Sequence, residues 1–369
     1  MNWKLPLIYV LINILFLVKY SLRIHITVCI FIGIFYILLC GLMFHFIYRK
    51  QYDVRNKTML LVFIGASVVL IGLQMSIDPY QIKVDRWSAI HNFLTYLFKG
   101  DYPYMAQTHL GGYGSPFPMW QIVHIPFYLL GNVGLSIFAA FGIFIYAIRL
   151  YGGNSVAFRA MFLLLLSPAF LYEIAVRSDL ITNFLLVSAI VILLYSYRVK
   201  LASHFRLIAI GCGLLMSTRF TAIIPLAIFY LVEWWKMGNL RKIFFPIIVI
   251  LSFVITFLPF MFWNINDLLF FKYNPFVLQS RQIHSIDFLL FIPLFLYLAI
   301  EWTKIRDSKN AFLHLTTNIA IFLLSIVVVT FIHNMIESGN FNLFSSSFDI
   351  TYFNMSLPFI VTGLSINSR

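Results

Sequence analysis

The segment 78–118, DPYQIKVDRWSAIHNFLTYLFKGDYPYMAQTHLGGYGSPFP, is a long polar interruption in a sequence that apolar runs dominate. Hydrophobic residues make up 61% of the 369 residues, whereas charged residues make up only 11%. The runs on both sides of the segment have the length of membrane-spanning helices, and a surface of this composition has to face lipid. The sequence therefore predicts an all-α, polytopic membrane protein whose polar chemistry is concentrated in this loop.

The apolar runs predict about twelve transmembrane helices in a single domain, 1–369, because no linker, charge block or internal repeat divides the chain. The expected spans are 5–22, 24–48, 59–77, 133–150, 155–171, 181–198, 206–217, 220–236, 243–263, 287–302, 311–333 and 351–366.

Basic residues cluster in the short loops on one side of these expected spans. The clusters are Arg49-Lys50 with Arg55 and Lys57, Arg198 with Lys200 and Arg206, Lys236 with Arg241-Lys242, and Lys304 with Arg306 and Lys309. Because cytoplasmic loops carry an excess of Lys and Arg, we place both termini in the cytoplasm. The three longer loops, at about 78–132, 264–286 and 334–350, then face the outer side, where we expect the function.

The net charge of +13 follows from this topology. The outer side carries as many acids as bases, so the excess positive charge lies in the cytoplasmic loops, and nucleic-acid binding has no support. Cys29, Cys40 and Cys212 lie inside apolar runs, which argues against a disulfide framework. No pair of histidines has the spacing of a metal site. We therefore expect no cofactor and no metal site built by the chain; a divalent cation stays open as an alternative that no feature of the sequence supports.

Asp85 begins an expected amphipathic interfacial helix, 85–99, in which apolar residues recur at spacings of three and four. A carboxylate held between water and a low dielectric can act as a general base on a sugar hydroxyl. The alternative is that Asp85 is an N-cap, because Asp is favoured at that position. The residue alone leaves both interpretations open.

Two further groups of charged residues lie at the expected outer ends of spans. Glu173, Arg177 and Asp179 separate two spans, and Arg219 lies between two unusually short ones. An ionisable residue in such a place needs a partner or a function. Arg177 and Asp179 could equally form a local salt bridge, whereas Arg219 could reach the lipid head groups or contact an acidic side chain or a phosphate.

The second outer loop combines Lys272 and Arg281 with aromatic and amide side chains, as a surface for lipid phosphate or glycan would, although many interfacial loops share this mixture. The candidate catalytic residue is Asp85. The candidate substrate-binding residues are Arg86, His91, Tyr104, His109, Glu173, Arg177, Asp179, Arg219, Lys272 and Arg281.

The order of these elements resembles the GT-C superfamily of membrane glycosyltransferases that use polyprenyl-phosphate sugars, including mannosyltransferases. The elements are the acid Asp85 in the first large outer loop, FKGDYPY from Phe98 to Tyr104, Ser-Pro-x-Pro from Ser115 to Pro118, Leu-Ser-Pro from Leu166 to Pro168, the acid Asp179, and Ser-Thr-Arg from Ser217 to Arg219. The resemblance covers about residues 59–236.

The resemblance implies an inverting transferase for a hexose such as mannose. It implies that Asp85 deprotonates an acceptor hydroxyl while the polyprenyl phosphate departs, and that Arg219, with Arg177 or Arg281, stabilises the charge on that phosphate. The implied partners are a polyprenyl-phosphate sugar donor, a glycan or lipid-linked acceptor, and membrane lipids. The implied location is a bacterial inner (plasma) membrane, with the active site on the outer face.

Two other classes of function compete with this expectation. A polymerase or ligase of lipid-linked polysaccharide also has about a dozen spans, but it should carry its large outer loop late in the chain. A flippase or transporter of lipid-linked oligosaccharide should show repeat symmetry and ionisable groups near the middle of the membrane. In this sequence the major loop comes early and most charges lie at the ends of spans.

Overall fold

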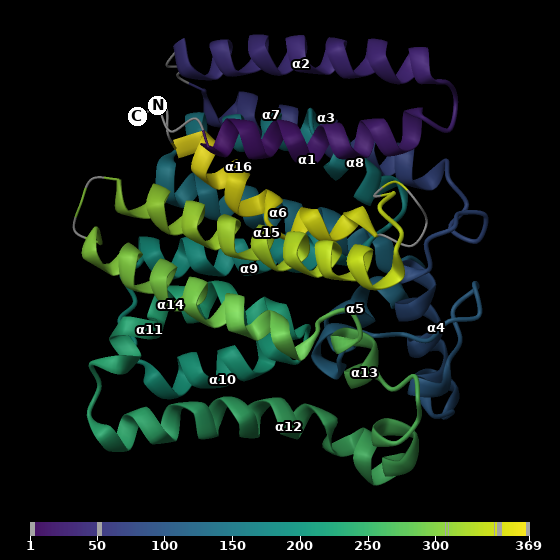
Figure 1. Ribbon diagram of the computed structural model, residues 1–369, viewed down its shortest axis with the longest axis vertical. Coiled ribbons are helices and arrows are strands. Elements are labelled where there is room, and N and C mark those ends of the chain that lie inside the picture. The colour runs from purple at the N-terminus through teal and green to yellow at the C-terminus, as the bar shows by residue number, and fades with distance from the viewer. Residues whose placement is uncertain are drawn as a thin grey trace.

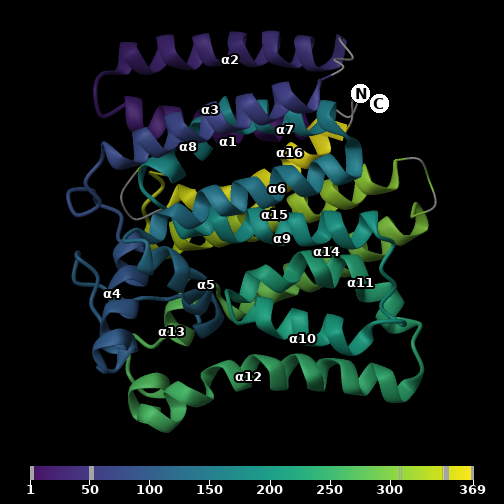
Figure 2. The same ribbon diagram turned by 180° about the vertical axis from the view of Figure 1, so that it is seen from behind.

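The computed structural model describes residues 4–49, 54–306, 308, 310–342, 344 and 349–366. Within these residues the regular structure is helical, and the strand-like pairing is limited to an isolated bridge between Gln107 and Tyr113. The long helices lie side by side, with α2 (Ile26–Arg49) and α12 (Asn239–Leu269) at opposite edges of the bundle (Figures 1 and 2). The all-α prediction is therefore confirmed for the described part of the chain.

Eight helices in the described residues are long and apolar enough to cross a membrane. They are α1 (Lys4–Ser21), α2, α3 (Asn56–Met75), η2 (Val133–Leu135) with α6 (Ser136–Gly152), α9 (Asp179–Ser196), α12, η4 (Ser285–Asp287) with α14 (Phe288–Lys304), and α15 (Ala311–Ser338). A ninth candidate is the bent pair α7 (Asn154–Leu165) and α8 (Pro168–Ala175). The protein thus has the helices of a polytopic membrane protein.

Three shorter apolar helices coincide with the remaining expected spans. They are α10 (Phe205–Met216), η3 (Phe220–Ile223) with α11 (Ile224–Trp235), and η5 (Ile350–Met355) with α16 (Leu357–Ile366). Their length and composition alone do not qualify them as spans, so the expected number of twelve crossings is not established by the helices themselves.

The Leu-Ser-Pro sequence bends the chain between α7 and α8 by 70°. Ser167 caps α8 by accepting a hydrogen bond from the backbone N–H of Phe170 at 3.2 Å, and Pro168 occupies the first position of the helix. Proline suits that position because it has no N–H to satisfy and its φ is already helical. The sequence therefore ends one helix and begins another in a new direction.

Close approach of helices requires a glycine at one point in the bundle. A Cβ added to Gly213 of α10 would lie 2.4 Å from the carbonyl oxygen of Val249 in α12. Only glycine permits this contact between the two backbones.

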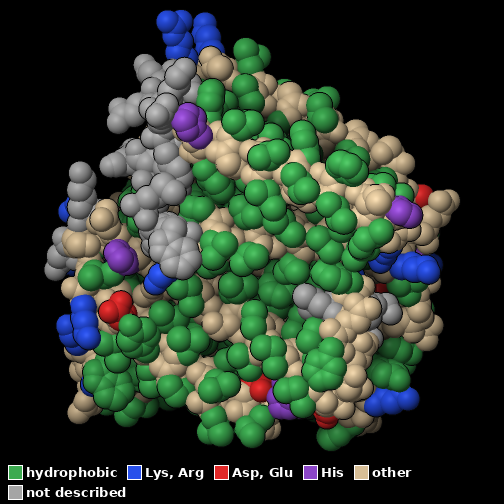
Figure 3. All heavy atoms as spheres, turned by 45° about the horizontal axis from the view of Figure 1, so that its top comes forward, with side chains coloured by type: hydrophobic (Ala, Val, Ile, Leu, Met, Phe, Trp, Pro, Cys, Tyr) green, Lys and Arg blue, Asp and Glu red, His purple; other side chains and the backbone are tan. Residues whose placement is uncertain are grey.

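The predicted outer loops meet at one end of the bundle. There α4 (Arg86–Lys99), η1 (Pro103–Met105), α5 (Pro118–Leu129) and α13 (Pro275–Ser280) gather, while the described chain ends lie at the other end (Figure 1). Hydrophobic side chains cover much of the face in Figure 3, and most charged ones lie toward its edges. Lys50, Lys309 and part of the loop 334–350 lie outside the described residues.

Candidate active site

A polar cavity of about 450 Å³ lies where α4 and α9 begin. Its charged lining residues are Asp85, Arg86, Asp179, Arg219, Arg281 and Asp349. Five of these were predicted from sequence as candidate site residues, and they come from four separate parts of the chain. The fold therefore brings these five predicted acids and bases into one site.

Asp85 occupies the N-cap position of α4, but its carboxylate makes no capping hydrogen bond. Instead, Oδ2 accepts a hydrogen bond of 2.9 Å from Thr108 Oγ1. A Cβ added to Gly112 would lie 3.2 Å from the same oxygen, so glycine leaves the space that this carboxylate occupies. The loop that follows α4 thus holds the Asp85 side chain at the cavity wall.

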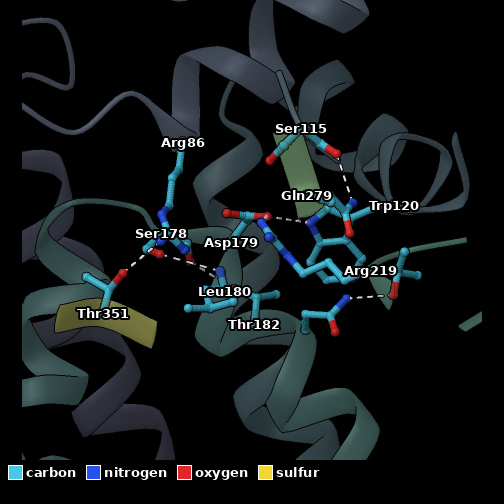
Figure 4. Close-up of polar contacts among 12 residues, drawn as sticks. Arg86, Ser115, Trp120, Ser178, Asp179, Leu180, Thr182, Arg219, Gln279 and Thr351 are labelled. Atoms are coloured by element: carbon cyan, nitrogen blue, oxygen red, sulfur yellow. Dashed lines mark hydrogen bonds and ion pairs between the residues drawn. The ribbon is translucent and has the colours of Figure 1, made fainter. Parts of the chain in front are cut away.

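Asp179 and Arg219 form a buried ion pair deeper in the cavity. Asp179 is the first residue of α9, and its Oδ2 accepts hydrogen bonds from Arg219 Nη2 at 2.5 Å and from Trp120 Nε1 at 2.9 Å (Figure 4). Arg219 has an extended backbone in the break between α10 and η3. Of the partners that the sequence allowed for Arg219, the structure shows an acidic side chain, that of Asp179.

The ion pair keeps unused hydrogen-bonding capacity. Asp179 Oδ1 and Arg219 Nε are both buried, and neither has a hydrogen-bond partner among the described residues. Buried polar atoms normally find partners, so unmatched ones that belong to cavity-lining residues favour a polar ligand there.

Arg86 closes another wall of the cavity by binding Asp349, which directly precedes η5. Its Nη2 donates to Asp349 Oδ2 at 2.6 Å and to Thr351 Oγ1 at 2.7 Å, the second of which is drawn in Figure 4. Burial by itself would raise the pKa of Asp349, but Arg86 and Thr351 hold that pKa below its usual range. The sequence prediction missed Asp349, because its contact with α4 joins residues far apart in the chain.

An apolar groove of about 550 Å³ adjoins the polar cavity. The two share Ser115, Arg219, Leu278 and Tyr352 as lining residues. One side of the groove is built by hydrophobic side chains of α14 and α15, among them Phe288, Phe291, Ile292, Phe295, Phe322 and Phe331. Phe288 is 51% exposed and Ile292 is 55% exposed, so the groove reaches the apolar surface of the bundle.

Three predicted residues of the first loop lie outside the lining of the polar cavity and pack locally. His91 stacks on Trp87 with ring centroids 4.6 Å apart, and burial lowers its pKa. Tyr104 is buried edge-on against Phe93. The two ring nitrogens of His109 face Ser88 Oγ at 2.7 Å and the carbonyl oxygen of Ile82 at 2.9 Å.

The other three predicted residues also lie outside this lining. Glu173 is buried and accepts a hydrogen bond from Asn354 at 2.8 Å. Arg177 donates to the carbonyl oxygens of Gln74 and Ile77 at the end of α3, so it ties two helices together and does not pair with Asp179. The exposed Lys272 lies over the ring of Tyr273, 4.6 Å from its centroid.

No group of three or more His, Cys, Asp or Glu side chains in the described part of the chain is arranged to hold a metal ion. The charged groups that line the cavity are carboxylates and guanidinium groups. No protein-family model, curated protein or solved structure matches the chain.

Proposed function

We propose that this protein is an inverting membrane glycosyltransferase of the GT-C type, which transfers a hexose such as mannose from a polyprenyl phosphate to a glycan or lipid-linked acceptor. The observation that carries the proposal is that Arg219 lines both the charged cavity and the apolar groove. A donor of this class has a long apolar chain, a phosphate and a sugar in sequence. A groove, a cation and a polar cavity in the same order are complementary to it.

Asp85 is the proposed general base. It takes the proton of the acceptor hydroxyl as the hydroxyl oxygen forms a bond to the anomeric carbon of the sugar. The bond from that carbon to the phosphate oxygen breaks on the opposite side, and the phosphate leaves with the bonding electrons. The hydrogen bond from Thr108 supports this role, because it fixes one carboxylate oxygen and leaves the other for the proton.

Arg219 is the proposed stabiliser of the departing phosphate. Asp179 binds its guanidinium and is itself held by the indole N–H of Trp120, while the buried Nε of Arg219 remains without a partner among the described residues. A hydrogen-bond-donating group that is held in place before the reaction stabilises the developing negative charge without having to reorganise. Arg281 is exposed at the cavity and supplies a second cation on the solvent side.

Twelve crossings and an outer active site belong to the same proposal. The eight long helices, the bent pair α7 and α8, and the three shorter apolar helices together supply the proposed number. The basic loops favour cytoplasmic termini, and the location proposed is a bacterial inner (plasma) membrane.

The proposal is tested by incubating the purified protein with polyprenyl-phosphate mannose or glucose and candidate acceptors, and by measuring the release of polyprenyl phosphate. Acceptor-dependent release supports the proposal. Transfer of whole oligosaccharides from a polyprenyl diphosphate, without use of the monophosphate donors, would instead identify the polymerase or ligase alternative. Movement of lipid-linked sugar between leaflets without bond cleavage would identify the flippase.

A further inference from the structure

A second cavity with charged walls lies at the opposite end of α9 from Asp179. It measures about 610 Å³, and its cationic lining residues are Arg198, Lys200 and Arg306. Its other walls include the aromatic side chains of Tyr151, Tyr195 and Phe229. We call it the basic cavity. Because α9 has 18 residues and a helix rises 1.5 Å per residue, about 27 Å separates this cavity from the candidate active site.

The basic cavity has more positive than negative charge among the described residues. Arg306 forms an ion pair with Glu233, whose other carboxylate oxygen accepts a hydrogen bond from the backbone N–H of Leu201. Arg198 and Lys200 make no ion pair or side-chain hydrogen bond with the part of the chain that the structure describes. Within the described part of the chain, Arg198 and Lys200 are therefore two exposed cations without a paired acid at the cavity.

The backbone of Arg198 is unusual and points to a role for its side chain. α9 ends with the N–H of Val199 bonded to the carbonyl of Leu194 and the N–H of Arg198 bonded to that of Tyr195. In this type of helix end, the residue at position 198 adopts the left-handed backbone conformation, and its φ is 50°. Glycine is favoured there because a Cβ makes the conformation unfavourable.

Arg177 gives an internal comparison, since it ends α8 in the same way with a φ of 54°. Its guanidinium binds the carbonyl oxygens at the end of α3, which explains why an arginine stands there. Arg198 has the same strained backbone without such contacts among the described residues, and its side chain lines the basic cavity. A ligand in the cavity would account for it.

We propose that the basic cavity binds a phosphate group, carried either by an anionic membrane lipid or by a small phosphorylated ligand. Arginine and lysine together suit phosphate, because the guanidinium offers paired donors and the ammonium a compact charge. Basic pockets between membrane helices are suited to the head groups of anionic lipids, with aromatic walls beside the glycerol region. This proposal is independent of the chemistry proposed for the other cavity.

The test measures the apparent melting temperature of the full-length protein in nanodiscs, at one scan rate. One arm compares phosphatidylcholine with phosphatidylcholine containing phosphatidylglycerol. The other adds inorganic phosphate to phosphatidylcholine nanodiscs, against chloride at equal ionic strength. The apparent melting temperature of wild type should rise on the order of 2 °C or more in at least one arm. The arm in which it rises identifies the source of the phosphate.

Arg198→Gly should lose this rise in melting temperature. In plain phosphatidylcholine it should nevertheless melt at or above the wild-type temperature, because glycine removes the backbone strain of the positive φ at position 198. Lys200→Gln should reduce the gain. The control is Lys236→Gln, an exposed lysine that is no lining residue of the cavity, which should keep the gain. The proposal is overturned if neither arm stabilises wild type, if Arg198→Gly keeps the full gain, or if Lys236→Gln loses as much as Arg198→Gly.

Discussion

Arg219 Nη2 lies 2.5 Å from Asp179 Oδ2 in a buried ion pair, at the junction of the polar cavity and the apolar groove. Removing one member of such a pair leaves the other charge buried without its partner. A neutral substitution of Arg219 therefore changes stability as well as any contact with a ligand. The two effects have to be separated by design.

Arg219→Gln and Asp179→Asn should each lower the free energy of unfolding by about 3–5 kcal/mol, because each leaves the other charge of the pair buried without a partner. The double variant should recover much of that loss, since both charges are then absent. Thermal unfolding of the four proteins in a double-mutant cycle measures the coupling. Additive losses would mean that the ion pair does not hold the site together.

Arg219→Lys should fold close to normally but lower the maximal rate of transfer, because an ammonium keeps the charge and loses the paired geometry. A contact that strengthens as the phosphate departs affects kcat, whereas uniform binding affects KM alone. Steady-state kinetics with a polyprenyl-phosphate hexose distinguishes the two. Unchanged kinetics would make Arg219 only the structural partner of Asp179, and the phosphate contact would then be sought at Arg281.

Thr108→Val should slow transfer on the order of 10-fold or more, since it removes the hydroxyl that orients the Asp85 carboxylate and keeps the volume of the side chain. Thr95→Val is the matched control, because the Thr95 hydroxyl bonds the carbonyl of His91 instead. Equal rates for the two variants would remove Thr108 from the proposed mechanism.

The bond between Arg86 and Asp349 predicts a dependence of stability on pH. The pKa of Asp349 is lower in the folded protein than in the unfolded chain, where it is about 3.9. The stabilisation is therefore fully present well above the unfolded pKa, and it is lost progressively as the pH falls through the unfolded and then the folded pKa. The difference in melting temperature between wild type and Asp349→Asn should be largest near neutral pH and shrink in acid. A difference independent of pH would contradict this assignment.

The two ends of the bundle should face opposite sides of the membrane. Asp101 and Lys236 are exposed and follow α4 and α11, which lie at opposite ends of the bundle in Figure 1. The native cysteines are buried, so they provide little background. Asp101→Cys should react with an impermeant thiol reagent in intact cells, whereas Lys236→Cys should react only after lysis. The reverse pattern would invert the topology and remove the outer active site.

The sequence predicted that Asp85, Asp179 and Arg219 lie on the same side, because charged residues beside apolar runs lie at the ends of helices. That they line one cavity is a finding of the structure. Each span carries the chain to the opposite side, so two residues separated by an even number of spans lie at the same end of the bundle. The contact partners of these residues could not be predicted in the same way. Thr108 reaches Asp85 through a turn within the first loop, and Asp349 reaches Arg86 from near the end of the chain.

His91, His109 and Arg177 illustrate why residue type alone does not identify a site. Each has the chemistry of a binding residue, but its partners are a neighbouring ring, a hydroxyl with a carbonyl, and two carbonyls at a helix end. Such contacts depend on how adjacent elements pack, which apolar patterning does not determine.

The central claim is that Asp85 removes a proton from the acceptor during transfer from a polyprenyl phosphate. The most direct measurement compares turnover of wild type, Asp85→Asn and Asp101→Asn, in which the control replaces an exposed aspartate that does not line the cavity. We predict that Asp85→Asn folds and melts like wild type but loses turnover on the order of 100-fold or more, while Asp101→Asn keeps it. Turnover of Asp85→Asn near that of wild type would contradict the account.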